Sequence, residues 1–356
     1  MDASLALFRR HPGLRGRLPH HPLLAGPTPV APFPLDGAAA LWIKRDEHST
    51  PVYGGNKPRK LEFLIGHALA RRSRRLLTTG GLGTNHGLAT TLLAREAGIE
   101  TTLVLVDQPV TDSVREQLRL YQGAGARLRY GGSVAGAVVK AAAELARSTA
   151  AGERPLLIPT GGTSSRGNLG FVSAGYEIAD QVAAGLLPEP ERVFVPIGSG
   201  GTLAGLVVGL RLAGLTTRVV GVLVTDLLPP SPARLARLAR ATLRRLRRLA
   251  PEVPALAISS ADFDYVSDQV GRGYGAASPA GDEARAAAAA LGVKLDPTYS
   301  AKALAGLRAA ARDGILAGPT LFWNTYNGVD VREKVRMADA AELPAPFQKF
   351  FDEAGS

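Results

Sequence analysis

The sequence predicts an α/β protein with parallel sheets, and two observations support this fold class. Short apolar runs rich in β-branched residues alternate along the chain with longer segments in which leucine and alanine recur at helical spacing. Several of these runs end in a glycine-rich turn that leads into the next helical segment. Such alternation is typical of right-handed βαβ units, whose helices cover a parallel sheet.

The predicted elements follow in regular order after an N-terminal arm, residues 1–35, in which proline and histidine are frequent and no period holds. The apolar runs predict strands at 41–47, 75–79, 101–106, 127–130, 156–158, 193–197, 219–224 and 320–323. The helical periods predict helices at 61–69, 85–97, 114–123, 134–150, 170–184, 231–250 and 282–291. The chain has 356 residues, 46% of them hydrophobic, which is enough for two lobes with separate cores.

The composition excludes several classes of site. The chain contains no cysteine, which excludes disulfides, cysteine–zinc sites and a cysteine nucleophile, and is compatible with the cytoplasmic location that we expect. No apolar run approaches the length of a membrane span, so we expect no membrane partner. We also expect no metal site.

Much of the formal net charge of +11 lies in residues 231–250, where seven arginines alternate with leucine and no acidic residue occurs. This pattern predicts a basic amphipathic helix, a kind of element that can bind nucleic acid or an anionic membrane surface. The segment lacks the aromatic residues that single-strand binders use for base stacking. We therefore favour a solvated helix face and expect no specific nucleic-acid partner, with binding to an anionic partner as the alternative.

Two glycine-rich loops carry the candidate chemistry. The first, residues 54–62, joins a predicted strand to a predicted helix and places Lys57 at the junction, where glycines let the backbone approach a flat ligand. The second, residues 198–202, also lies between a strand and a helix, an arrangement in which backbone N–H groups hold a phosphate. It lacks the lysine of a P-loop and the glycine spacing of a dinucleotide fold, so we expect a monophosphate. Taken alone, the first loop is more simply interpreted as a surface loop with solvated lysines.

Both loops belong to a set of four motifs, at 55–62, 80–86, 198–202 and 296–302, which occur in this order in a known family. In these motifs the chain resembles the pyridoxal-phosphate enzymes of the tryptophan synthase β-subunit fold (fold type II), in the branch that holds 1-aminocyclopropane-1-carboxylate (ACC) deaminase and D-cysteine desulfhydrase. The resemblance implies a homodimer of two-lobed subunits, with three-layer open sheets and pyridoxal 5′-phosphate between the lobes. It places a large domain at 1–49 and 166–356, and a small inserted domain at 50–165.

The resemblance also assigns the cofactor contacts. Lys57 would form the Schiff base with the cofactor aldehyde, and Lys60, three residues further on, is the rival for that role. The other implied contacts are Gly198, Ser199, Gly200, Gly201 and Thr202 at the phosphate, Asn85 at the ring oxygen, and Thr325 at the pyridine nitrogen.

For the substrate, the resemblance implies contacts from Gly81, Thr84, Asn85, His86, Gly162, Tyr274 and Ser300. Thr84, Tyr274 and Tyr299 would join Lys57 as catalytic residues. Each role has a simpler alternative: Thr84 can be a helix N-cap, His86 a helix-start residue without chemistry, and the two tyrosines buried packing residues.

The activity that the resemblance implies is a pyridoxal-phosphate-dependent lyase reaction, namely β-elimination from a small D-amino acid such as D-cysteine to give a 2-oxo acid and ammonia. Ser300 and Thr325 match the desulfhydrase pattern, whereas Gly83, Leu88 and residues 324–328 depart from the branch and leave the substrate open. The alternatives are ring opening of ACC and a catalytically silent protein that binds an anionic partner through its basic helix.

Overall fold

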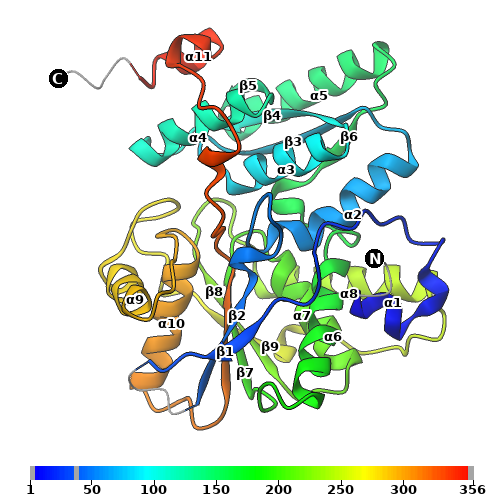
Figure 1. The fold of residues 1–356 in the computed structure, drawn as a ribbon, viewed down its shortest axis with the longest axis vertical. Coiled ribbons are helices and arrows are strands. Elements are labelled where there is room, and N and C mark those ends of the chain that lie inside the picture. The colour runs from blue at the N-terminus through cyan, green and yellow to red at the C-terminus, as the bar shows by residue number, and fades with distance from the viewer. Residues whose placement is uncertain (1–4, 36–39, 352–356) are drawn as a thin grey trace. The chain divides into compact units, whose positions relative to one another are not determined.

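The computed structural model describes residues 5–35 and 40–351, and it confirms the predicted α/β class. The chain forms two compact units: the first contains Met1–Phe63 and Thr163–Gly328, and the second contains Leu64–Gly162 and Val329–Ser356. Figure 1 shows each unit as a sheet with helices on its faces. The observed unit boundaries differ from the limits of 50 and 165 expected for the inserted domain, which stay a prediction.

The first unit is organised around a six-stranded sheet in the order β1-β2-β10-β7-β8-β9. The strands are β1 (Val30–Pro32), β2 (Leu41–Arg45), β7 (Arg192–Ile197), β8 (Arg218–Leu223), β9 (Phe263–Val266) and β10 (Thr320–Asn324). All neighbours pair in parallel except β1, which is antiparallel to β2. The segments that follow β2, β7 and β10 therefore leave from the same edge, where open parallel sheets bind their ligands.

Helices cover both faces of this sheet, as Figure 1 shows. They are α1 (Ala6–Arg10), α6 (Leu169–Ala183), α7 (Gly201–Leu212), α8 (Pro232–Leu249), α9 (Pro279–Ala290) and α10 (Ser300–Arg312). Because side chains alternate across a strand, Val193 and Val195 of β7 pack with α6, α7 and α8, whereas Phe194 packs with α9 and α10. The first unit thus has three layers.

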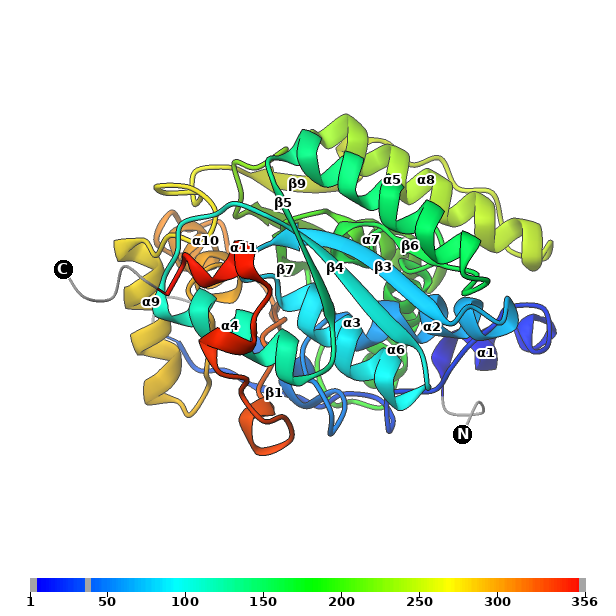
Figure 2. The same ribbon diagram turned by 90° about the horizontal axis from the view of Figure 1, so that it is seen from above.

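The second unit has a fully parallel four-stranded sheet in the order β5-β4-β3-β6 (Figure 2). Its strands are β3 (Arg75–Gly81), β4 (Glu100–Val106), β5 (Arg127–Gly132) and β6 (Leu156–Ile158). Its helices are α3 (Asn85–Glu96), α4 (Asp112–Gly123), α5 (Val134–Ala150) and α11 (Ala345–Gln348), and α2 (Lys57–Ala70) begins in the first unit and ends in the second. Arg119 of α4 donates to the carbonyl of Ala338 at 2.6 Å, which ties the C-terminal segment to this unit.

Short 3₁₀ turns complete the described chain at Pro12–Leu14, Asp46–His48, Thr160–Gly162, Ser260–Asp262, Val331–Glu333 and Ala340–Glu342. The basic segment forms the predicted helix, α8, with Leu235, Leu243 and Leu246 buried in the core. Its leucines therefore serve the packing of the first unit. Within residues 5–35 and 40–351, no helix is both long and apolar enough to cross a membrane.

Candidate active site

Lys57 is the first residue of α2 and is placed there by a tight loop that follows β2. A Cβ on Gly54 would lie 1.8 Å from the carbonyl oxygen of Glu47, and Gly55 has a φ of +80° while its N–H donates to the carbonyl of Asp46. Only glycine fits both positions without strain. The glycines before the lysine are thus required by the close approach of two backbone segments.

The amine of Lys57 is set up to react with a carbonyl group. Its Nζ donates a hydrogen bond to Oδ1 of Asn56 at 2.5 Å and lies 5.7 Å from the centre of the Tyr299 ring. Burial lowers the pKa of Lys57 to about 8, against the opposing attraction of Asp296. Near neutral pH a larger fraction of this amine is therefore unprotonated than for an exposed lysine, and the unprotonated amine is the nucleophile.

The amine of Lys60 points to a different part of the site. It donates to Oγ1 of Thr163 at 3.4 Å, and a Cβ on Gly201 would lie only 2.9 Å from it. Burial, with repulsion from Lys57, lowers the pKa of Lys60 to about 7. An anion at the loop between β7 and α7 would hold this amine in its charged form. Lys60 therefore fits a phosphate contact better than the aldehyde bond.

The loop at 198–202 has the features of an anion cradle. Gly200 adopts the left-handed conformation, with a φ of +84°, immediately before α7 begins at Gly201. The hydroxyls of Ser199 and Thr163 lie 2.6 Å apart, and Nδ2 of Asn56 donates to Oγ1 of Thr202 at 3.3 Å. The positive end of a 12-residue helix, two hydroxyls and the buried Lys60 amine converge there.

Tyr299, whose ring centre lies 5.7 Å from the Lys57 amine, is paired with a second phenol, Tyr274. The hydroxyls of Tyr274 and Tyr299 are 2.6 Å apart, and their rings meet edge to face. Burial raises the pKa of each phenol, and for Tyr299 the adjacent Tyr274 raises it further. Both phenols are therefore protonated at neutral pH. The structure brings these two predicted residues together with the predicted lysine.

Asp296, which was not among the predicted site residues, organises the segment that presents Tyr299. Its carboxylate accepts hydrogen bonds from the backbone N–H groups of Thr298, Tyr299 and Ser300. It also accepts from Oγ of Ser300, at 2.6 Å. The sequence signal at this residue is the Asp296-Pro297 pair, since Asp-Pro favours the start of a turn.

Ser300 and Thr325 differ in the hydrogen bonds that their hydroxyls make within the protein. Ser300 is fully buried, and its hydroxyl is engaged by Asp296. Thr325 follows β10, and its carbonyl accepts from the N–H of Asn56 at 3.4 Å. Its hydroxyl has no hydrogen bond to any residue that the structure describes. Thr325 therefore keeps a free hydroxyl for a ligand, and the predicted roles of both residues stay predictions.

The remaining predicted substrate contacts lie in the second unit, so the structure does not place them relative to Lys57. Because β3 and β6 pair in parallel, Gly81 and Gly162 lie at the same edge of the second sheet. Thr84 caps α3, since its hydroxyl accepts from the N–H of Gly87. Backbone N–H groups at this helix start suit a carboxylate, and the cap does not exclude that role.

Asn85 and His86 follow the cap on α3. Oδ1 of Asn85 accepts a hydrogen bond from Nε2 of Gln117 at 3.1 Å, which holds the amide in the second unit. His86 is buried, and a ring nitrogen lies 3.5 Å from Oγ1 of Thr90. These contacts give both side chains a structural role, and their predicted ligand roles stay predictions.

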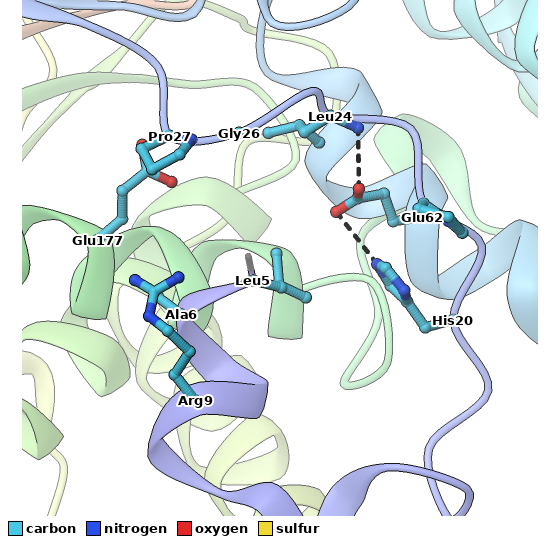
Figure 3. A pocket seen from close by; sticks show the side chains of 10 residues that line it. Leu5, Ala6, Arg9, His20, Leu24, Gly26, Pro27, Glu62 and Glu177 are labelled. Carbon is cyan, nitrogen blue, oxygen red and sulfur yellow. Dashed lines mark hydrogen bonds and ion pairs between the residues drawn. The ribbon is translucent and has the colours of Figure 1, made fainter. Parts of the chain in front are cut away.

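A separate pocket lies beneath the N-terminal arm, between the arm and helices α2 and α6 (Figure 3). Oε1 of Glu62 accepts from the N–H of Leu24 at 3.0 Å, and Nε2 of His20 lies 3.6 Å from Oε2 of Glu62. None of the predicted site residues lines this pocket. Its contacts hold the arm against the first unit.

The fold and these side chains define an α/β enzyme whose site fits a phosphorylated aldehyde cofactor. A reactive lysine, a second buried amine and a glycine cradle at a helix start are the groups that such a cofactor requires. The sequence profile described as "Pyridoxal-phosphate dependent enzyme" matches residues 22–325. The chain therefore belongs to the pyridoxal-phosphate-dependent enzyme family, and the predicted cofactor is confirmed.

Similar proteins confirm the predicted branch. Nocardicin C-9′ epimerase of Nocardia uniformis subsp. tsuyamanensis is 36% identical over 87% of this chain and 93% of its own length. D-cysteine desulfhydrase of Salmonella paratyphi C is 32% identical over 87% of this chain and 94% of its own. A crystal structure of an ACC deaminase homologue matches with a TM-score of 0.76 and 30% identity, covering 90% of this chain and 94% of that one.

We expect the substitution Lys60→Gln to weaken binding of pyridoxal 5′-phosphate about tenfold or more, because it removes a charge-assisted hydrogen bond. Binding of pyridoxal, which lacks the phosphate, should change little. Absorbance titrations of the apoprotein with both compounds measure the two affinities. Lys294→Gln is the matched control, since Lys294 is exposed. An equal loss of affinity for pyridoxal would contradict the assignment of Lys60 to the phosphate.

Proposed function

We propose that the protein is a pyridoxal-phosphate-dependent lyase that eliminates the β-substituent of a small D-amino acid such as D-cysteine and releases a 2-oxo acid and ammonia. The observation that carries the proposal is the pair of protonated phenols, Tyr274 and Tyr299, next to an amine of lowered pKa, Lys57. Elimination requires both a base and an acid within one site.

The bound cofactor supplies the aldehyde that takes up the substrate amine and the ring that accepts electrons. With cofactor and substrate bound, the unprotonated amine of Lys57 would be placed to accept the proton from the α-carbon. The tyrosine pair can then donate a proton to the departing substituent. The neutral hydroxyl of Thr325, which the family resemblance implies at the pyridine nitrogen, would leave that nitrogen unprotonated. A hydroxyl at that place would thus favour the loss of a leaving group over storage of carbanion charge.

Epimerisation at the α-carbon is the second candidate. The similarity to nocardicin C-9′ epimerase motivates it. Both reactions begin with removal of the α-proton, and they differ in whether a substituent leaves or a proton returns. The same pairing of Lys57 with two phenols could supply a base and an acid for that return. Ring opening of ACC is a further alternative, motivated by the solved ACC deaminase homologue.

The proposal extends to partners and location. A homodimer and a cytoplasmic location are what the family resemblance and the cysteine-free composition lead us to propose. We propose no specific nucleic-acid partner, since the leucines of α8 are used in packing and its arginines carry no base-reading aromatic residue beside them. The hypothesis that we favour least is a catalytically silent protein that binds an anionic partner through α8.

A screen of D- and L-amino acids for 2-oxo acid release by the holoenzyme tests the proposal. We expect D-cysteine or β-chloro-D-alanine to be consumed faster than ACC. Exchange of the α-proton in D₂O, followed by chiral chromatography, detects epimerisation in the same samples. Turnover of ACC faster than that of every β-substituted amino acid would overturn the proposal. Proton exchange with inversion and no 2-oxo acid would support the epimerase instead.

A further inference from the structure

Lys302 provides a buried amine that the proposed reaction leaves unused. It lies in the first turn of α10, is fully buried, and donates hydrogen bonds to the carbonyls of Val270 at 2.7 Å and Gly273 at 3.0 Å. Burial of an amine is unfavourable unless its N–H groups donate hydrogen bonds, so the two acceptors identify the segment that Lys302 binds. Both belong to residues 270–275, the tyrosine loop, which carries Tyr274.

The tyrosine loop cannot fix its own conformation. Gly271, Gly273 and Gly275 have φ values of +62°, +114° and +80°, a region that glycine enters freely. A segment with three glycines within five positions loses more backbone freedom on ordering than other sequences do. The position of Tyr274 must therefore come from contacts with the rest of the unit.

Asp226, which follows β8, provides the second of these contacts. Its Oδ1 accepts the N–H of Tyr274 at 2.8 Å. A Cβ on Gly273 would lie 2.7 Å from its Oδ2, so the backbone of the loop packs directly on the carboxylate. Lys302 and Asp226 also attract each other electrostatically. The loop is thus bound through its carbonyls by a cation and through an N–H by an anion.

We propose that Lys302 and Asp226 clamp the tyrosine loop and thereby hold the hydroxyl of Tyr274 at hydrogen-bond distance from that of Tyr299. Tyr299 is the N-cap residue of α10 and Lys302 lies three residues later, so one helix start fixes both partners. Lys302 is a positioning residue, because it acts through Tyr274. The inference rests on the proposed function only where it links the tyrosine pair to proton transfer.

A double-mutant cycle tests the clamp. Lys302→Met in the holoenzyme is expected to lower kcat for the best substrate about tenfold or more, with a small change in KM, since it frees an acid that acts after binding. Because both changes disable the same phenol, Lys302→Met combined with Tyr274→Phe should be no slower than Tyr274→Phe alone. Lys294→Met is the matched exposed control. Independent effects that multiply would overturn the proposal.

Amide hydrogen exchange gives a readout that does not depend on the reaction. In Lys302→Met, peptides covering 270–275 should exchange about tenfold faster or more than in the wild type, while β7 peptides keep their protection. If Lys302→Met fails to fold, Asp226→Ala, at an exposed position, should give the same pattern. Unchanged exchange in the loop overturns the clamp. If the wild-type holoenzyme shows no lyase activity while the tyrosine loop of Lys302→Met still exchanges faster, the clamp is supported and the proposed function is rejected.

Discussion

Replacement of Lys57 by alanine is expected to lower kcat at least about a thousandfold, because the variant loses both the nucleophile for the cofactor and the base for the α-proton. The cofactor should remain bound without a covalent bond, since the cradle at 198–202 and Lys60 are untouched. Steady-state rates measure the loss. The absorbance band at about 410–430 nm, which marks lysine-bound cofactor, should disappear.

Borohydride reduction of the wild-type holoenzyme followed by peptide mapping is the control. We expect the label on Lys57 and none on Lys60, since the amine of Lys57 lies 5.7 Å from the centre of the Tyr299 ring and that of Lys60 donates to Thr163. The rate of pyridoxal addition to the apoprotein should rise with pH and level off above pH 8, because the pKa of the amine is about 8. An ordinary lysine would become more reactive up to about pH 10. Label on Lys60 would refute the assignment.

The parts of the site that could be predicted are those whose signal is local in the sequence. The loops that contain Lys57 and residues 198–202 each join a strand to a helix, so the neighbouring residues were enough to predict their position in the fold. The contacts of Lys60 and Lys302 were missed because their acceptors, in Thr163 and Val270, lie far away in the sequence. Those of Asp296 were missed because they depend on where the next helix starts. A sequence pattern gives no measure of such distances.

The fold shows the same division. The eight predicted strands all form, most of them from apolar runs and β5 from the alternation of Leu128 and Tyr130 with arginines. The edge strands β1 and β9 were not predicted, because Pro32 and Asp264 leave neither with a continuous apolar run. Helix α10 was also missed, although the motif at 296–302 overlaps its start. The domain limits were harder still, because α2 passes from one compact unit into the other.

Arg59, two residues after Lys57, holds the start of α2 through a buried network of charges. Its guanidinium donates to Asp46 at 2.8 and 2.9 Å and to Glu177 of α6 at 2.9 Å. Lys44 of β2 donates to the same Glu177, and the Trp323 indole donates to Asp46 at 2.8 Å. Arg59 and Lys44 are at most 1% exposed, so the two cations and two carboxylates balance within the core.

We expect Arg59→Met to lower the free energy of unfolding by about 3–5 kcal/mol, because it leaves two buried carboxylates with one cation. Urea unfolding of the holoenzyme measures the loss. Arg59→Lys keeps the charge without the two-pronged geometry and should lose less. Arg234→Met, at an exposed arginine of α8, is the matched control and should change stability by about 0.5 kcal/mol or less.

The pH dependence separates charge balance from loss of packing. Burial alone would raise the pKa of Glu177, but Arg59 and Lys44 hold it at about 2, below its usual value of about 4.5. A depressed carboxyl pKa contributes stability that is present above pH 4.5 and lost as the pH falls toward 2. Without Arg59 this pKa rises, so the stability difference between the wild type and Arg59→Met should shrink over that interval. A difference that stays constant from pH 7 to pH 3 would assign the loss to packing alone.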